Sequence, residues 1–202
     1  MDLSSPLATL TSPVEAGILK VLARADTEFS GRQVHRLSGV GSAPGVWKAL
    51  QRLSESGLVH ARQRPSETLY SLNREHLLFP AIEAALAAEQ TLFDRMRTFT
   101  EEHAPEGTSV SVFGSVSRRE AGPGSDVDLV VTFPDDVDED TASQFRDDLA
   151  VAIERWTGNA ASIIALPETD AKTQLGSHEP IFVSMKRDAV YLVGPMDIAR
   201  LA

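Results

Sequence analysis

Apolar residues between positions 110 and 133 recur in two short runs, and this pattern predicts two strands. Apolar residues at positions 110, 112 and 113 are typical of a buried strand. From Gly114 to Gly124 the chain is polar and rich in glycine, which predicts a turn. The second run, residues 125–131, alternates again and indicates a strand that begins at Ser125. We therefore expect two strands here, joined by a polar turn.

The second predicted strand opens with two carboxylates, Asp126 and Asp128. Side chains alternate along a strand, so both should lie on one face, about 7 Å apart at Cα. Two carboxylates on one face are costly unless water, a cation or hydrogen bonds compensate them. Mg²⁺ binds through one or two carboxylates together with substrate phosphates. Gly114 and Ser115 would offer a backbone amide and a hydroxyl to those phosphates. The pattern therefore predicts a Mg²⁺–nucleotide site.

After this strand the apolar period changes to that of a helix and then back again. Apolar residues at 145, 149 and 153 predict a helix that Thr141 caps and that ends near Trp156. The acidic run at 135–140 is expected to be solvated. Residues 161–166 predict a third strand, and residues 190–193 close the domain. The polar pair His178-Glu179 is expected on the surface.

The first part of the chain shows a different order of elements. Helices are expected at residues 12–22, 29–37 and 42–57, followed by strands at 58–62 and 68–72. Ser30 is the expected cap of the second helix, with Val34 and Leu37 facing inward. Three short helices followed by a hairpin is the order of a winged helix-turn-helix.

Residues 78–103 carry a helical apolar stripe that is interrupted at Glu89. We expect one long connector helix, at residues 79–104, that packs on both domains. A homodimer seam is the alternative use of this stripe, although its heptad positions are not sustained.

Charge is divided unevenly along the 202 residues, whose net charge is −10. Residues 1–78 contain nine Lys/Arg and seven Asp/Glu, a balance of +2, whereas the remaining ten Lys/Arg and 22 Asp/Glu give −12. The acidic part suits a small, metal-bridged nucleotide better than a long nucleic acid. This difference indicates two parts with different partners.

Composition also narrows the class of protein. No apolar run approaches the roughly 18 residues that a membrane-spanning helix needs. The first residues lack the basic start and apolar core of a secretory signal. The absence of cysteine excludes disulfides and thiolate metal sites. We therefore expect a cytoplasmic protein with no membrane partner.

The segments Gly114-Ser115-Val116-Ser117-Arg118 and Ser125-Asp126-Val127-Asp128-Leu129 closely resemble the signature of the DNA polymerase β-like nucleotidyltransferase superfamily. The likeness is greatest to its small, minimal members. The resemblance implies that the paired aspartates are catalytic and hold Mg²⁺. It also implies that an NTP is bound by four residues: Gly114, Ser115, Arg118 and Ser125.

The chain departs from this family pattern at Ser162. Active relatives carry a third aspartate on the strand that follows the helix, where it completes the metal site and helps to activate the attacking hydroxyl. Serine cannot neutralise Mg²⁺ and is not a base near pH 7. Glu168 or Asp170 would substitute only if the loop that carries them folded back toward the aspartates. Nucleotide binding is thus better supported than turnover.

Residues 12–73 resemble the DNA-binding domains of bacterial and archaeal winged-helix regulators, and residues 46–59 resemble their recognition helix running into the wing. The resemblance and the residue chemistry imply double-stranded DNA as a partner. The expected contacts are Ser42, Lys48, Gln51 and Arg52 at a major groove, and Arg62 and Arg64 at phosphates. The alternative is a small helical domain that contacts other proteins.

These observations together predict an α+β protein. Its parts would be a winged helix-turn-helix domain (residues 1–78), the connector helix (79–104), and a nucleotidyltransferase domain with a mixed β-sheet and flanking helices (105–202). The predicted function is Mg²⁺-dependent transfer of a nucleoside monophosphate from an NTP to an acceptor that the sequence does not identify. The alternative is a DNA-binding transcriptional regulator whose degenerate nucleotidyltransferase domain binds nucleotide without turnover.

Overall fold

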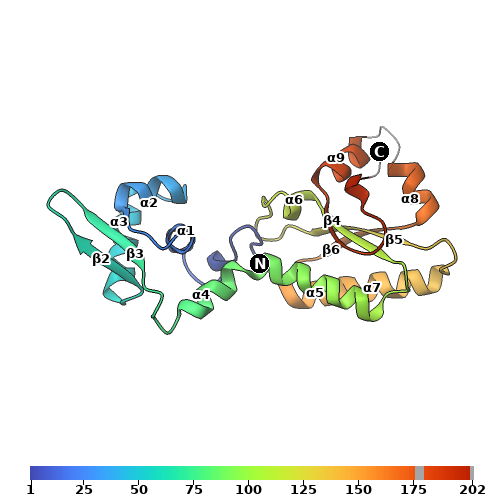
Figure 1. The fold of residues 1–202 in the computed structure, drawn as a ribbon, viewed down its shortest axis with the longest axis horizontal. Coiled ribbons are helices and arrows are strands. Elements are labelled where there is room, and N and C mark those ends of the chain that lie inside the picture. The colour runs from blue at the N-terminus through green and yellow to red at the C-terminus, as the bar shows by residue number, and fades with distance from the viewer. Residues whose placement is uncertain (176–179, 201–202) are drawn as a thin grey trace. The chain divides into compact units, whose positions relative to one another are not determined.

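The computed structural model describes residues 1–175 and 180–200, and it contains both helices and sheets, as expected for an α+β protein (Figure 1). The chain divides into two compact units. The N-terminal unit is Ser5–Ala88, and the C-terminal unit joins Met1–Ser4 to Glu89–Ala202. The polar pair at positions 178 and 179 lies outside the described residues. No helix among the described residues is long and apolar enough to cross a membrane.

The N-terminal unit has the predicted order of three helices followed by a hairpin. It also contains a short strand, β1, that the sequence did not predict, and the strand order of its antiparallel sheet is β1-β3-β2. Its elements are η1 (Pro6–Thr9), α1 (Pro13–Ala23), β1 (Phe29–Ser30), α2 (Gly31–Ser38), α3 (Ala43–Glu55), β2 (Val59–Gln63), β3 (Thr68–Leu72) and α4 (Phe79–Leu86).

Serine caps start all three of the helices α1, α2 and α3. Ser30 accepts a hydrogen bond from the Gln33 N–H, and the Gln33 side chain accepts one from the Ser30 N–H, which forms a capping box. Val34 is fully buried, but Leu37 is 49% exposed, so its predicted inward position is wrong. Leu37 follows Val34 by three residues, so the two side chains point about 60° apart around the helix axis, and Leu37 lies at the edge of the buried face.

The single long helix predicted over residues 79–104 is instead two helices, α4 and α5 (Ala88–His103), with a break at Ala87. The break coincides with a change of core. Ile82 on α4 packs in the core of the N-terminal unit, whereas Met96 on α5 packs in the core of the C-terminal unit. The interruption of the apolar stripe near Glu89 was thus the end of one buried face and the start of another.

The C-terminal unit is built on a four-stranded mixed sheet with strand order β6-β5-β4-β7. Strands β5 and β6 are parallel, and the other two pairs are antiparallel. The elements that follow α5 are β4 (Ser109–Phe113), α6 (Gly114–Ser117), β5 (Val127–Phe133), α7 (Glu139–Thr157), β6 (Ala161–Pro167), α8 (Glu168–Leu175), α9 (Pro180–Asp188), β7 (Val190–Val193) and η2 (Ile198–Arg200).

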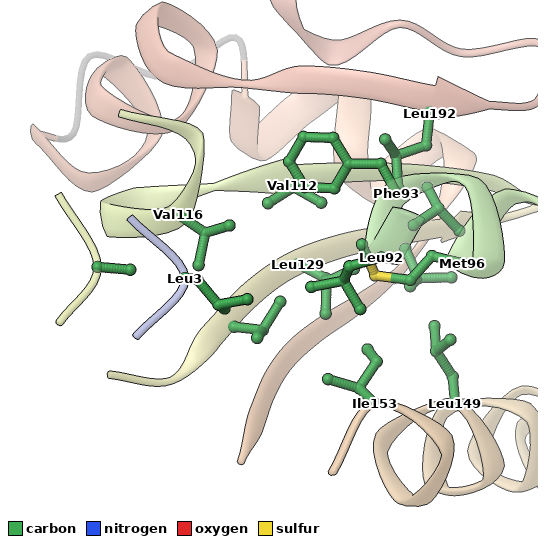
Figure 2. Close-up of a cluster of buried hydrophobic side chains, with 14 of the residues drawn as sticks. Leu3, Leu92, Phe93, Met96, Val112, Val116, Leu129, Leu149, Ile153 and Leu192 are labelled. Atoms are coloured by element: carbon green, nitrogen blue, oxygen red, sulfur yellow. The ribbon is translucent and has the colours of Figure 1, made fainter. Parts of the chain in front are cut away.

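Helices cover both faces of this sheet (Figure 1). On one face, Leu129 of β5 packs with side chains of α5 and α7, such as Met96 and Leu149, in the core drawn in Figure 2. On the other face, Val130 packs with residues of α8, α9 and η2. Because side chains alternate along β5, Asp128 lies on the same face as Val130.

Helix α7 begins earlier than the sequence indicated. Its cap is Asp138, whose carboxylate accepts hydrogen bonds from the N–H (2.9 Å) and the hydroxyl (2.8 Å) of Thr141. The prediction of Thr141 as the cap is therefore wrong, because the acid three residues before it makes the same bond to the helix start. The negative charge of Asp138 also complements the helix dipole.

Candidate functional site

One edge of the four-stranded sheet gathers the polar residues that the sequence singled out. Strand β4 ends at this edge, and β5, β6 and β7 begin at it, because β5 is antiparallel to β4 and parallel to β6 while β7 is antiparallel to β4. Gly114 follows β4, Asp126 and Asp128 stand at the start of β5, Ser162 is the second residue of β6, and Asp188 precedes β7. Segments up to 74 positions apart in sequence thus converge on one edge.

Gly114 brings the backbone against the carboxylate of Asp128. The register of β4 and β5 pairs Phe113 with Asp128. Gly114 has φ +73°, a left-handed conformation, and a Cβ at this position would lie 2.2 Å from Asp128 Oδ2. Only glycine fits both the conformation and the space. The Asp128 carboxylate therefore lies directly against the backbone of this turn.

Replacing Gly114 with Ala tests this close approach. The left-handed conformation alone should cost about 1–3 kcal/mol of unfolding free energy, and the added methyl must also displace the Asp128 carboxylate. Gly158→Ala is the matched control, because Gly158 has φ +70° and nothing within 4 Å of a built Cβ. In denaturant titrations we expect Gly114→Ala to lose more stability than Gly158→Ala. Equal losses would show that Asp128 does not constrain the turn.

Asp126 lies one residue before β5, because the strand starts at Val127 and not at Ser125 as predicted. Its charge still reaches Asp128. Burial raises the pKa of the Asp128 carboxyl, the neighbouring Asp126 charge raises that pKa further, and Arg118 opposes both effects. Within the described part of the chain, no hydrogen bond or ion pair reaches either carboxylate.

This donor set fits a hard divalent cation. Two carboxylates, one of them half-buried and raised in pKa by the other, are what Mg²⁺ would compensate. Among residues 1–175 and 180–200, no group of three or more His, Cys, Asp or Glu side chains could hold a metal ion. Asp126 and Asp128 therefore match the mode in which Mg²⁺ takes only one or two carboxylates and completes its shell with phosphates and water.

Ser162 stands beside Asp128 in the sheet. The parallel register of β5 and β6 pairs these two residues, so their side chains share one face, and Ser162 is exposed. Neither substitute carboxylate lies in a loop, since Glu168 and Asp170 both belong to α8. Glu168 also accepts a hydrogen bond from Lys172 at 2.5 Å. The neighbour of Asp128 on β6 is thus a hydroxyl and not a carboxylate.

Arg118 is held by two carboxylates. Its guanidinium donates to Glu120 Oε2 and to Asp188 Oδ2, both at 2.9 Å. Arg187 also donates to Asp188, and these bonds, from Arg187 first and then Arg118, lower the pKa of Asp188 to about 2. Sequence reasoning missed Asp188, because it lies 70 positions from Arg118 and the residues around it give no sign of this pairing. Arg118 is accordingly held between two carboxylates, of which Asp188 is the less exposed.

Ser125, the fourth predicted nucleotide-binding residue, closes a turn. Its hydroxyl oxygen accepts from the Gly122 N–H at 3.0 Å, and its own N–H donates to the Gly122 carbonyl at 3.1 Å. The hydroxyl proton is not used in these two bonds. Ser115 lies in the first turn of α6, half-buried, and its carbonyl accepts from the Glu120 N–H at 2.8 Å.

The predicted DNA contacts of the N-terminal unit are largely engaged within that unit. Arg52 on α3 forms an ion pair with the buried Glu15 of α1. Arg62 on β2 donates from Nε to Glu28 at 2.6 Å, and this pairing lowers the pKa of Glu28. Gln51 donates to Glu55 on the same helix at 2.9 Å. Carboxylates thus balance both arginines at these positions.

The other three predicted DNA contacts differ in role. Ser42 caps α3 by accepting from the Gly45 N–H at 3.3 Å. Lys48 is exposed on α3, and Arg64 is exposed just after β2. Arg64 also contributes, through its charge, to the lowered pKa of Glu28. Of the four cations among the predicted DNA contacts, Lys48 and Arg64 are therefore the two that form no ion pair with the described residues.

Part of the C-terminal unit matches a model of a known protein family. Residues 93–175 match the nucleotidyltransferase domain family, a span that contains Gly114, Asp126, Asp128 and Ser162. This match supports a general function in nucleotidyl transfer. No curated protein matches the chain.

Three solved structures show limited likeness to the chain. A toxin–antitoxin structure with AMP-PNP is 17% identical, with 52% of this chain and 74% of that chain covered and a TM-score of 0.37. A nucleotidyltransferase structure from Sulfolobus solfataricus is 17% identical, with 55% and 87% covered and a TM-score of 0.34. The archaeal chromatin protein TrmBL2 is 17% identical, with 84% and 70% covered and a TM-score of 0.31.

Proposed function

We propose that the C-terminal unit is a Mg²⁺-dependent nucleotidyltransferase that moves a nucleoside monophosphate from an NTP to a hydroxyl acceptor. One observation carries this proposal: the Asp128 carboxylate lies against the Gly114 backbone, where a Cβ would be 2.2 Å from it. A phosphate bound at that turn is thereby next to the carboxylates that bind its counter-ion. The family match over residues 93–175 supports the same chemistry.

The roles follow from the positions of the side chains. Asp126 and Asp128 would hold Mg²⁺, which when bound neutralises phosphate charge and stabilises the leaving pyrophosphate. Gly114 and Ser115 would bind the triphosphate through backbone amides and a hydroxyl. Ser125 would donate its remaining hydroxyl proton to the nucleotide. Arg118, held by Asp188 at 2.9 Å, would present its free N–H groups to a phosphate oxygen.

Transfer of label from each α-³²P-labelled NTP, with and without Mg²⁺, tests this function. We expect Mg²⁺-dependent label on an acceptor, and the protein itself should be checked as one acceptor. Asp126→Asn with Asp128→Asn is the control that should lose the signal. Label transfer that persists in this double variant would overturn the assignment of the site.

Ser162 supports a second candidate function. With a hydroxyl paired to Asp128 where active relatives have a third aspartate, the site keeps its two metal ligands but lacks a base. The alternative is therefore a transcriptional regulator: a winged helix in the N-terminal unit binds DNA, and the C-terminal unit senses nucleotide without turnover. Mg²⁺–nucleotide binding without label transfer would favour this reading over the first.

DNA binding by the N-terminal unit makes its own prediction. If Arg64 meets a phosphate, Arg64→Ala should reduce the slope of log Kobs against log salt by about 0.9. Because Glu28 pairs with Arg62 (2.6 Å), Glu28→Gln should free that cation and tighten binding at low salt. Fluorescence anisotropy with a duplex measures both effects.

Arg155→Ala is the control for this titration, since it removes an exposed positive charge from α7 of the C-terminal unit. It should leave the salt slope unchanged. An absence of duplex binding at low salt in the wild type would instead make the N-terminal unit a protein-contact module.

A further inference from the structure

Asn159 is a buried residue whose side chain is hydrogen-bonded to Ser125, the residue before Asp126. It is 2% exposed and lies just after the end of α7, two residues before β6. Its Nδ2 donates to the Ser125 carbonyl at 2.8 Å and to the Met1 carbonyl at 3.1 Å. Its Oδ1 accepts from the Met1 nitrogen at 2.5 Å. One amide therefore joins the residue before Asp126 to the first residue of the chain.

The first four residues also contact the loop before Asp126 and the end of α7. Leu3 is 3% exposed and belongs to the core of the C-terminal unit, where Figure 2 shows it among the buried side chains. The Ser4 N–H donates to the Ala121 carbonyl at 3.2 Å. The Met1 nitrogen donates to the Thr157 carbonyl at 2.9 Å. Residues 1–4 thus tie the 121–125 loop to the end of α7.

The loop before β5 is fixed at both of its ends. Ala121 is held by Ser4, and the Val127 N–H donates to the Ala160 carbonyl at 2.8 Å. Between these points, the Ser125 carbonyl is bonded by the Asn159 side chain, next to Asp126 in the chain. Asp126 itself lies one residue before β5, and among the described strands it belongs to none of the register pairs that β5 forms with β4 and β6. Its backbone is therefore placed by the bonds to its neighbours.

We propose that Asn159, together with residues 1–4, is a positioning residue that sets the Asp126 carboxylate relative to Asp128. This inference rests on the proposed function, because it concerns the metal–nucleotide site of the same reaction. Asn159 suits the role chemically. A buried amide can donate to two carbonyls and accept from an N–H at once, whereas an aliphatic side chain would lose all three of these hydrogen bonds.

Asn159→Ala and a matched control separate positioning from general stability. Thr100→Val is the control, because Thr100 is equally buried (3% exposed) in the same unit and its hydroxyl donates only to the Met96 carbonyl at 2.8 Å. Both variants should lower the melting temperature. Only Asn159→Ala should weaken Mg-ATP binding, measured by calorimetry, by about tenfold, at the lower end of outer-sphere effects on metal sites. It should also speed hydrogen exchange at the Ser125 and Val127 amides.

A double-mutant cycle decides whether Asn159 acts through Asp126. In the Asp126→Asn background, Asn159→Ala should weaken Mg-ATP binding less than about twofold further. A full tenfold loss in that background, or an equal loss in Thr100→Val, would overturn the inference while leaving the proposed function intact. No Mg-ATP binding in the wild type would overturn the proposed function and this inference with it. Should Asn159→Ala not fold, Asn159→Ser, too short to reach the Ser125 carbonyl, is measured in its place.

Discussion

Ser162→Asp is expected to raise the rate of nucleotidyl transfer by about 10²–10⁴-fold, the usual worth of a general base. The β5–β6 register puts the new carboxylate beside Asp128 on the same face of the sheet. There it can share the metal and accept the proton of the attacking hydroxyl. The gain corresponds to roughly 3–5 kcal/mol of activation free energy at 1.36 kcal/mol per tenfold. Single-turnover transfer from an α-labelled NTP measures it.

Ser162→Asn is the matched control, since asparagine has the size of aspartate without its charge or basicity. It should leave the transfer rate near that of the wild type. Because Ser162 is exposed, the aspartate should fold without a large loss of melting temperature. Wild-type transfer at about 1 s⁻¹ or faster would mean that another group already supplies the base, which would contradict this argument.

Asp128→Asn is expected to lower Mg-ATP affinity by about 100-fold or more. Loss of an outer-sphere partner already costs about 10–100-fold in metal affinity, and the loss of a ligand should cost no less. Val127→Ile, a buried neighbour with no ligand role, is the comparison for general disturbance of β5. Calorimetry that finds unchanged Mg-ATP binding in Asp128→Asn would refute the assignment of the metal site.

The same substitution should stabilise the protein at neutral pH. Burial and the charge of Asp126 raise the pKa of Asp128, so the ionised carboxylate is less favourable in the folded than in the unfolded chain. Asp128→Asn removes this cost above the ordinary pKa of aspartate, and the difference in stability should vanish as the pH falls below that value.

Asp188→Asn should have the opposite effect and destabilise the protein at neutral pH. The folded pKa of Asp188 is about 2, so its contribution is present at neutral pH and is lost as the pH falls toward 2. Melting temperatures at several pH values check both signs.

The local parts of this site follow from short stretches of sequence. Alternation along residues 126–129 puts Asp128 on the opposite face from the buried Val127 and Leu129, whereas residues 129–133 are all buried and show no alternation. Gly114 is the first residue of α6, which is four residues long, and a polar turn of the expected kind leads from α6 to β5. Patterns with a period of two or a glycine at a turn are properties of neighbouring residues, so they can be seen without the fold.

The distant partners could not be seen in this way. Asp188 pairs with Arg118 across 70 positions, and Asn159 bonds to Ser125 across 34 and to Met1 across 158. Nothing in the local pattern around Asn159 distinguishes it from an ordinary residue of a turn after a helix. The break at Ala87 could not be predicted for a related reason. The apolar stripe over residues 78–103 shows the period of a helix, but it does not show that its two halves pack in different cores.

Because residues 1–4 belong to the C-terminal unit, they determine which fragments of the chain keep that unit's core complete. Although Ser5–Ala88 separates them in sequence from the rest of the C-terminal unit, Leu3 fills part of that unit's core and Met1 holds Asn159. A fragment that began at Glu89 would lose this leucine, and loss of a buried leucine side chain typically costs about 2–5 kcal/mol. The C-terminal unit is therefore discontinuous in sequence, and a fragment that keeps its core intact must carry the first four residues grafted ahead of residue 89.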